Sequence, residues 1–245
     1  MPRGGEVVLS TLRLAQVGAV DEDAGEVTVG AGATLSAVQR AARAAGWEVG
    51  IDLAARDSAT IGGMVATNAG GVNVVRHGPM RSQLAGFEAV LADGSVIRRL
   101  PGMPKDNTGY DLGGLLAGSE GTLAVITAVR LRLVPPLRHR AVCLIGFADS
   151  ATAVAAAAEL RRRLASVLAL ELFTDAGLEL VMRHAAVGPP FAVRTPIYLL
   201  AEAGSDETDP ADALFAMLEA LSVDEASVAV VGEPFGDDLE PGAVE

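Results

Sequence analysis

Residues 52–71 read DLAARDSATIGGMVATNAGG, and two pairs of glycines recur eight residues apart in this stretch, at positions 62–63 and 70–71. Glycine lets the backbone approach a flat or anionic ligand closely, and a run of such residues exposes successive N–H groups. Hydroxyl and amide side chains in the same stretch add further donors. The apolar residues between the glycines predict a short helix packed inward, which a flexible linker would lack. The stretch is therefore a candidate site for a phosphate or a flavin.

The composition of the whole chain predicts two domains. The chain has 245 residues, of which half are apolar and 20% are charged, which is typical of a soluble globular protein with one large or two modest domains. Of the 28 glycines, 21 precede residue 137. Pro135-Pro136 interrupts the chain at the same point, because proline lacks an N–H donor and biases its predecessor toward an extended conformation. We expect the boundary there, between domains 1–136 and 137–245.

In residues 1–136, short β-like runs alternate with few helices, which predicts an α+β domain with glycine-rich loops. Thr34 can cap a helix that ends before Gly46, with apolar residues at helical spacing between them. Asp93-Gly94 predicts a hairpin turn. The expected strands are Val7–Leu9, Val27–Val29, Phe87–Leu91, Val96–Ile97 and Thr122–Val134.

In residues 137–245, strands and helices alternate, which predicts a small sheet covered by helices. Asp149 or Ser150 is expected to cap the first helix, and Pro210 to lie in the first turn of the last. The expected strands are Ala141–Phe147, Val167–Phe173, Pro196–Ala201 and Val228–Val231, and the expected helices span residues 150–164, 176–184 and 211–221.

Acidic residues are concentrated at the end of the chain. Residues 201–245 hold 13 of the 31 acidic residues and none of the 19 basic residues. This segment would repel nucleic acid, which also needs a clustered basic face, so nucleic acid is not an expected partner. The cluster Arg161-Arg162-Arg163 is expected to be a solvated helix face.

The start of the chain and its single cysteine predict a cytoplasmic protein. Residues 1–6 lack the apolar core of a secretory signal, and no stretch is apolar enough to span a membrane. Cys143 lies in an apolar run, so we expect a buried strand thiol rather than a nucleophile. A chain without disulfides suits a reducing compartment.

A second glycine-rich turn, residues 30–35, follows an expected strand and opens an expected helix, and Asp52 lies 22 residues after Gly30. This layout imitates the βαβ unit that binds dinucleotides. The third small residue of that unit, which lets helix and strand pack closely, is replaced here by Leu35. We favour an ordinary strand-to-helix turn, with an NAD(P)-binding reductase as an alternative.

Four further motifs follow residues 52–71 in order, and they are Arg76-His77-Gly78, Val90–Gly94, Lys105–Leu112 and Gly118–Leu123. Together the five motifs resemble the flavin-linked oxidases of the vanillyl-alcohol-oxidase type, which carry a PCMH-type FAD-binding domain. The branch they resemble contains D-2-hydroxyacid dehydrogenases, D-lactate dehydrogenase and glycolate oxidase. The resemblance covers about residues 6–136.

The resemblance implies a fold, a cofactor and a set of binding residues. Residues 1–136 would form the FAD-binding domain, made of two α+β subdomains of which the first is incomplete. Residues 137–245 would form part of a ferredoxin-like α+β cap domain with an acidic tail. The residues implied to contact FAD are Asp52, Ser58, Thr60, Ile61, Gly62 and Gly63 at the pyrophosphate and isoalloxazine, then Asn68, Gly70, Gly71 and Gly78, and finally Glu120, Gly121, Val125 and Ile126 at the second end of the cofactor.

The implied activity is oxidation of a D-2-hydroxy acid, such as D-lactate or glycolate, by hydride transfer to flavin N5, with the electrons leaving to an acceptor. Members of the family carry a pyrophosphate loop before the strand that corresponds to residues 6–10, and metal-binding histidines beyond the cap. We therefore expect residues 1–245 to bind FAD weakly or not at all, and we assign no catalytic residue and no metal site. His77, His139, His184 and Glu171 are interpreted as structural or, for Glu171, substrate-side groups. The alternative is a non-catalytic remnant, or one half of a split flavoprotein that needs a partner chain.

Overall fold

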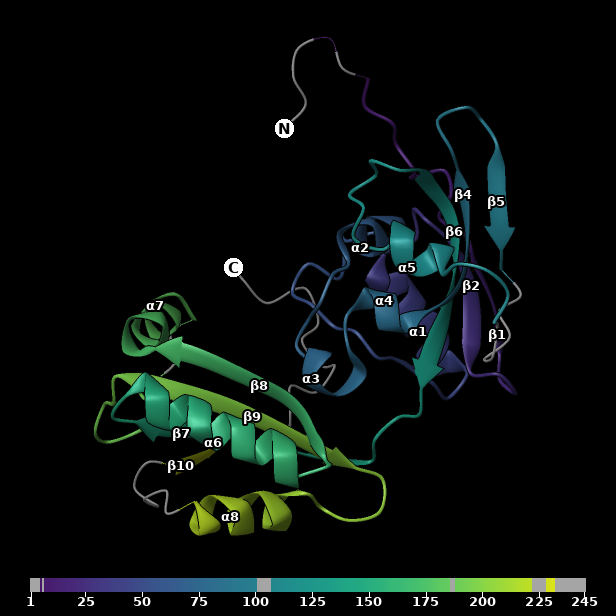
Figure 1. Cartoon of the computed structure of the whole chain (residues 1–245). Coiled ribbons are helices and arrows are strands. Elements are labelled where there is room, and N and C mark those ends of the chain that lie inside the picture. Colours follow the sequence, from purple (N-terminus) through teal and green to yellow (C-terminus); the bar gives the residue numbers. More distant parts are fainter. Residues whose placement is uncertain (1–4, 6, 101–106, 186–187, 222–227, 232–245) are drawn as a thin grey trace, which may run out of the picture. The chain divides into compact units, whose positions relative to one another are not determined.

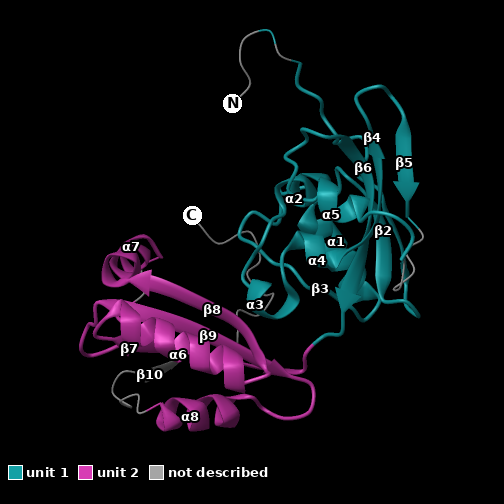
Figure 2. Cartoon of the chain, in the orientation of Figure 1, with its two compact units in different colours: residues 1–136 teal, residues 137–245 magenta. Residues whose placement is uncertain are grey.

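The computed structural model describes residues 5, 7–100, 107–185, 188–221 and 228–231. The chain divides into two compact units, Met1–Pro136 and Leu137–Glu245, which Figure 2 shows in different colours. We refer to them as unit 1 and unit 2 and describe each by itself. Residues 222–227 and 232–245 of the acidic end of the chain lie outside the described residues, as do Lys105 and Asp106 of the fourth motif.

Unit 1 is built on one antiparallel sheet. Its strand order is β1 (Val17–Asp21), β2 (Glu26–Gly30), β6 (Val125–Val134), β4 (Leu84–Val90) and β5 (Val96–Arg99), and the short β3 (Glu48–Val49) also pairs with β6. Both neighbours of β2 run antiparallel to it. A dinucleotide-binding βαβ unit needs parallel strands. The interpretation of residues 30–35 as such a unit, on which the alternative of an NAD(P)-binding reductase depended, is therefore wrong.

Helices cover one face of this sheet (Figure 1). They are α1 (Leu35–Ala44), α2 (Ile61–Thr67), α3 (Val74–His77), α4 (Met80–Gln83) and α5 (Leu112–Leu116). Val27, Val129 and Leu131 of the sheet are buried with Leu35 of α1 and Ile61 of α2 in one hydrophobic cluster. Burial of this apolar face is the main favourable contribution to folding of the unit.

The predicted local signals of unit 1 are largely confirmed. Thr34 caps α1, and its Oγ1 accepts a hydrogen bond from Ala37 N at 3.3 Å. Gly46 follows the end of this helix with φ +77°, a left-handed conformation that glycine adopts without strain. Strands β4 and β5 pair antiparallel across the Asp93-Gly94 turn.

The strand predicted at Val7–Leu9 is wrong. These residues form no strand, and Val7 is 93% exposed. The place beside β2 is taken by β1, while the N–H groups of Gly30 and Gly32 donate to the carbonyls of Gln16 and Leu14, at 2.8 and 2.9 Å. The apolar run at residues 7–9 predicted a strand from its composition, but pairing with β2 depends on which segment reaches it.

The described residues of unit 2 form a four-stranded antiparallel sheet with three helices. Its strand order is β10 (Val228–Val231), β7 (His139–Phe147), β9 (Ile197–Ser205) and β8 (Val167–Thr174), and its helices are α6 (Ser150–Arg163), α7 (Asp175–Ala185) and α8 (Ala211–Ala220). Numbered along the chain, the strands are arranged 4-1-3-2, which is the order of the ferredoxin-like fold. The predicted α+β class and the ferredoxin-like cap are therefore confirmed. Asp149 caps α6 through a 2.8 Å bond from Thr152 N.

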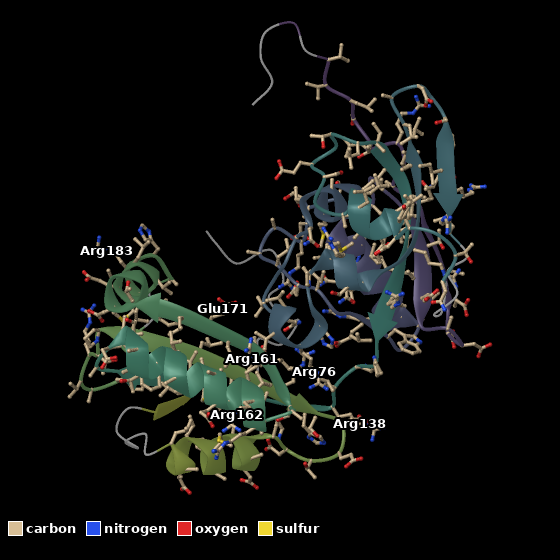
Figure 3. All side chains as sticks on the ribbon, viewed as in Figure 1. Arg76, Arg138, Arg161, Arg162, Glu171 and Arg183 are labelled. Carbon is tan, nitrogen blue, oxygen red and sulfur yellow. The ribbon has the colours of Figure 1, made fainter. Side chains whose placement is uncertain are left out.

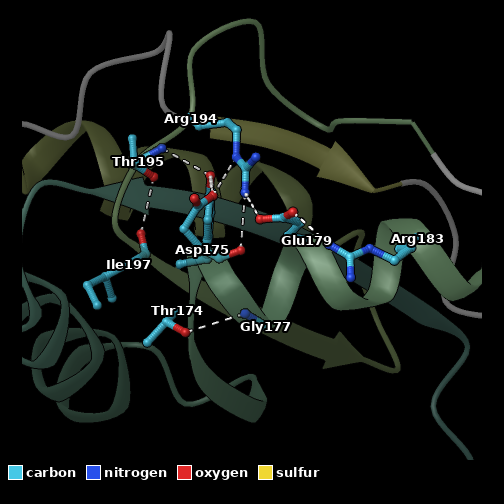
Figure 4. A network of polar contacts seen from close by, with 9 residues as sticks. Thr174, Asp175, Gly177, Glu179, Arg183, Arg194, Thr195 and Ile197 are labelled. Atoms are coloured by element: carbon cyan, nitrogen blue, oxygen red, sulfur yellow. Dashed lines mark hydrogen bonds and ion pairs between the residues drawn. The ribbon is translucent and has the colours of Figure 1, made fainter.

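A polar network joins α7 to the loop that precedes β9 (Figure 4). Arg194 Nε donates to Asp175 Oδ1 at 2.7 Å, and its Nη2 lies 3.5 Å from Glu179 Oε2. The hydroxyl of Tyr198, which is fully buried, accepts from Thr195 N at 3.0 Å and lies 3.3 Å from Asp175 Oδ1. The network therefore holds the start of α7 and the loop against the sheet.

The charged residues that the sequence singled out in unit 2 lie at its surface (Figure 3). Glu171 is exposed on β8. Arg161, Arg162 and Arg163 are exposed on α6, and Arg162 and Arg163 each pair with Glu159 at 2.7 Å. The three arginines form a solvated helix face, as predicted, and they complement the negative end of the helix dipole.

Cys143 on β7 is buried at the centre of the sheet of unit 2, and this burial raises the pKa of its thiol to about 12. We expect iodoacetamide at pH 8 not to alkylate Cys143 in the folded protein, because the thiolate is the reactive species. The same reagent should alkylate it fully in the denatured protein. The pKa of Cys143 is higher in the folded state than in the unfolded state. Its contribution to the free energy of unfolding is therefore fully present below pH 9 and is lost as the pH rises toward 12. Mass spectrometry that finds rapid modification at pH 8 in the folded state would contradict this account.

Candidate functional site

The glycine-rich stretch 52–71 folds around α2, and the start of this helix is bound tightly to the turn after β2. Ile61 N and Gly62 N donate to the carbonyls of Ala33 and Ala31, at 2.9 and 2.8 Å. The N-cap Thr60 accepts from Gly63 N through its Oγ1 at 3.4 Å. The first three N–H groups of α2 therefore have partners inside the fold, so Thr60, Ile61 and Gly62 serve first to dock the helix.

The two glycines at the start of α2 differ in their surroundings. A Cβ built on Gly62 would lie 2.5 Å from Ala31 Cβ, so only glycine permits this close approach of helix and turn. A Cβ on Gly63 would meet only Thr60 Oγ1, at 3.1 Å, and Gly63 is exposed. Thr67, one turn further along α2, is also exposed. The outer face of α2 is thus a small, open surface without bulky side chains at its start.

Asp52 is engaged by its neighbours in the fold. Its Oδ1 accepts from Gln39 Nε2 at 3.1 Å and from Leu53 N at 3.0 Å, and its Oδ2 accepts from Arg56 Nη2 at 2.7 Å. The carboxylate therefore ties the loop after residue 51 to α1. Sequence reasoning found Asp52 but missed Gln39, because nothing in the sequence shows that α1 passes beside this loop.

Gly70 and Gly71 form the second open point of the stretch. No hydrogen bond within the described part of the chain uses the N–H group of either residue. A Cβ on Gly70 would have only Val74 Cγ2 nearby, at 3.8 Å. Gly71 has φ +137°, and a side chain there would overlap the carbonyl oxygen of Asp52. The pair therefore offers two backbone donors that no described residue accepts from, on a turn that the bond from Val72 N to Asp52 O holds in place.

The end of α2 brings together residues that are distant in the sequence. Asn68 ends the helix in the left-handed conformation, with φ 50°. Gly118 N and Glu120 N donate to the carbonyls of Val65 and Ala66, at 3.0 and 2.8 Å. Glu120 is also left-handed, and Gly121 beside it is exposed with no atom within 4 Å of a built Cβ. The structure therefore places the expected site residues 120 and 121 beside Asn68.

The remaining expected site residues contribute less to this surface. Ser58 is exposed, and its hydroxyl donates to Ala55 O at 3.3 Å. Gly78 has φ +74° at the turn into α4, where a side chain would meet Ser82 Oγ. Val125 is exposed at the start of β6, whereas Ile126 is buried in the core. Gly78 is thus required by the backbone conformation of the turn, and Ile126 contributes to the hydrophobic core.

The described residues contain no group of three or more His, Cys, Asp or Glu side chains that could hold a metal ion. In the same part of the chain, no helix has the length and apolar character that crossing a membrane requires. The groups around α2 include backbone N–H groups, hydroxyls and open glycines. Such a surface suits a flat ligand that carries phosphate.

Comparison with known families identifies both halves of the chain. Residues 2–99 match the family described as FAD binding domain, and residues 136–234 match the family described as FAD linked oxidases, C-terminal domain. The expected site residues Glu120, Gly121, Val125 and Ile126 lie between these two matches.

The chain also resembles whole enzymes. It is 39% identical over 216 residues to mitochondrial D-2-hydroxyglutarate dehydrogenase of Bos taurus. The aligned region covers 87% of this chain and 40% of that protein. It is 39% identical over 180 residues to D-lactate dehydrogenase of Archaeoglobus fulgidus. The aligned region covers 74% of this chain and 40% of that protein. The chain thus spans about 40% of the length of these relatives.

A solved structure shares the fold. Alkyldihydroxyacetonephosphate synthase superimposes with a TM-score of 0.71 at 17% sequence identity, over 91% of this chain and 43% of that protein. At this low identity, the likeness concerns the fold alone.

The paired glycines at the start of α2 yield a stability test. Gly62→Ala should lower the free energy of unfolding by about 1–3 kcal/mol, because the new methyl group overlaps Ala31. Gly63→Ala should cost less than about 1 kcal/mol, because Gly63 is exposed, alanine favours the helix, and the new methyl group meets only Thr60 Oγ1, at 3.1 Å. Urea denaturation of both variants measures the difference. Equal effects of the two substitutions would show that α2 is not packed closely on the 30–33 turn.

Proposed function

We propose, because the chain belongs to the FAD-linked oxidase family with a PCMH-type FAD-binding domain, that it forms the flavin-binding surface and part of the cap of an enzyme that oxidises a D-2-hydroxy acid. The observation that supports this most directly is the agreement of two matches in chain order, an FAD binding domain at residues 2–99 and an FAD-linked oxidase C-terminal domain at residues 136–234. FAD is the cofactor of this family.

The surface around α2 fits such a cofactor. Gly70 and Gly121 have space where a side chain would otherwise stand, and Gly63 is exposed. The N–H groups of Gly70 and Gly71 have no partner within the described residues. Backbone donors of this kind bind phosphate oxygens without the entropic cost of fixing a long side chain. We assign the role of FAD contact to these positions and to Asn68, Glu120 and Thr67 near them. Thr67 is an addition to the residues expected from the sequence.

Asp52, Thr60 and Gly62 support the cofactor indirectly in this proposal. Their hydrogen bonds and close contacts hold the start of α2 and the 70–71 turn in fixed positions. A rigid backbone cradle binds more tightly than a mobile one, because less conformational entropy is lost on binding. Ser58, Ile61, Gly78, Val125 and Ile126 remain candidates at the edge of this surface.

When bound, the flavin supplies the acceptor for a hydride from the α-carbon of the hydroxy acid. The hydroxyl proton must pass to a base, and the products are a 2-oxo acid and the reduced cofactor, whose electrons leave to a further acceptor. Relatives named for D-2-hydroxyglutarate and D-lactate favour a small D-2-hydroxy acid as the substrate class. We also propose a cytoplasmic location, although several relatives carry the word mitochondrial in their names.

The flavin surface can be tested at one glycine. Gly70→Val should raise the FAD dissociation constant at least about tenfold, because the side chain occupies the space next to a free backbone donor. Gly188→Val, at an open position in unit 2, serves as the control and should change the constant by less than about twofold. Fluorescence titration of FAD measures both. Gly71 is unsuitable, because its positive φ makes any side chain destabilising.

If the wild-type protein shows no affinity for FAD, the proposed function fails for this chain. If Gly70→Val binds FAD as tightly as the wild type, the flavin lies elsewhere.

The substrate class is tested by stereochemistry. In the full-length gene product loaded with FAD under anaerobic conditions, the D-enantiomers of 2-hydroxyglutarate or lactate should bleach the flavin absorbance. The matching L-enantiomers should not, because the hydride must face the flavin in a single orientation. Bleaching by neither series, or equally by both, would exclude a D-2-hydroxy acid dehydrogenase.

A further inference from the structure

We propose that Arg81 is a positioning residue of the candidate flavin surface, where it holds the turn formed by residues 117–121 against the end of α2. The statement about the turn depends only on the contacts of this chain, whereas its importance for FAD rests on the proposed function. Sequence reasoning did not select Arg81, which lies three residues beyond the Arg76-His77-Gly78 motif.

The backbone of Arg81 is fixed by the end of α2. Met80 N donates to Ala69 O at 2.8 Å, and Arg81 N donates to Asn68 Oδ1 at 2.9 Å. These two bonds attach the first turn of α4 to the two residues that follow α2. The position of the Arg81 side chain is therefore set by the same helix that carries the open glycine face.

The side chain of Arg81 then reaches the second segment. Its Nη2 donates to Ala117 O at 2.5 Å, and Ala117 is buried. A hydrogen bond from a charged donor is stronger than one between neutral groups, and a buried carbonyl that loses its partner is destabilised. Arg81 thus fixes the point at which the 117–121 turn begins.

The turn returns to α2 and closes a ring of contacts. Gly118 N and Glu120 N donate to Val65 O and Ala66 O, as described above. The turn needs left-handed backbone at Gly118, Glu120 and Gly121, with φ of +84°, 50° and +74°. The left-handed conformation is unfavourable for Glu120, because this residue has a side chain, so surrounding contacts must stabilise it. Arg81 links the turn to the segment that follows α2 through a side chain, whereas the bonds of Gly118 and Glu120 to α2 join backbone to backbone.

Removal of this link is the test. Arg81→Met keeps most of the apolar stem but removes the donors. Arg132→Met is the matched control, because Arg132 Nη1 also donates to backbone carbonyls, those of Ser82 and Leu84, but not to the 117–121 turn. Two quantities are measured in the full chain: the amide hydrogen exchange of Gly118 and Glu120 without flavin, and the FAD dissociation constant. Thermal unfolding establishes that each variant is folded.

We expect Arg81→Met to accelerate exchange at Gly118 and Glu120 and to raise the FAD dissociation constant, each about tenfold, as for loss of one charge-assisted hydrogen bond. Arg132→Met should change neither quantity by more than about twofold. If Arg81→Met does not fold, Arg81→Lys is compared with Arg132→Lys by the same criteria, since lysine lacks the planar guanidinium fork.

Unchanged exchange in the Arg81 variant, or equal acceleration in the Arg132 variant, overturns the positioning role. Accelerated exchange with unchanged FAD affinity shows that the turn is held by Arg81 but does not serve the flavin, which overturns the second half of the proposal. If the wild type does not bind FAD, the proposed function fails, and the exchange measurement still decides the role of Arg81 in the turn.

Discussion

The close approach of α2 to the turn after β2 is the constraint on which the rest of unit 1 depends. Gly62 permits it, because any side chain there would overlap Ala31. Once the helix is this close, the N–H groups of Ile61 and Gly62 can donate to the carbonyls of the turn. A helix of seven residues has little stability of its own. Its position is therefore determined by tertiary contacts at both ends.

Everything proposed to meet the cofactor is attached to one of those ends. The loop of Asp52 and the turn of Gly70 and Gly71 are joined to each other by the bond from Val72 N to Asp52 O at 3.0 Å. The turn of Glu120 and Gly121 is attached to the carbonyls at the helix end. The glycines of this region accordingly divide into those that allow close packing, such as Gly62, and those that leave open space, such as Gly70 and Gly121. In the proposed function, this motif of paired glycines serves both the folding of unit 1 and the binding of the cofactor.

Unit 2 reaches its stability by a different route. Its sheet has a fully buried centre, where Cys143 and Tyr198 lie, and its loops are fastened by a polar network around Arg194. Tyr198 stacks between Phe173 and Phe191, with ring centroids 5.6 and 5.7 Å apart. Such a buried hydroxyl must have partners, because an unsatisfied polar group would be costly. Glu171 on β8 is exposed within this unit.

The sequence by itself determined the α+β class, the cap of α1 by Thr34, the hairpin at Asp93-Gly94, the alternating elements of unit 2 and the kinship with FAD-linked oxidases. These features rest on local signals, since a cap, a turn or a run of glycines is encoded within a few residues. It failed at Val7–Leu9, because an apolar run does not show which segment will pair with β2. Only the tertiary structure decided which glycine of each pair is open, that Asp52 is engaged by Gln39 and Arg56, and that Arg81 reaches the turn beside Glu120. These contacts join segments up to 36 residues apart, and such non-local pairing follows from packing of the whole unit rather than from any one motif.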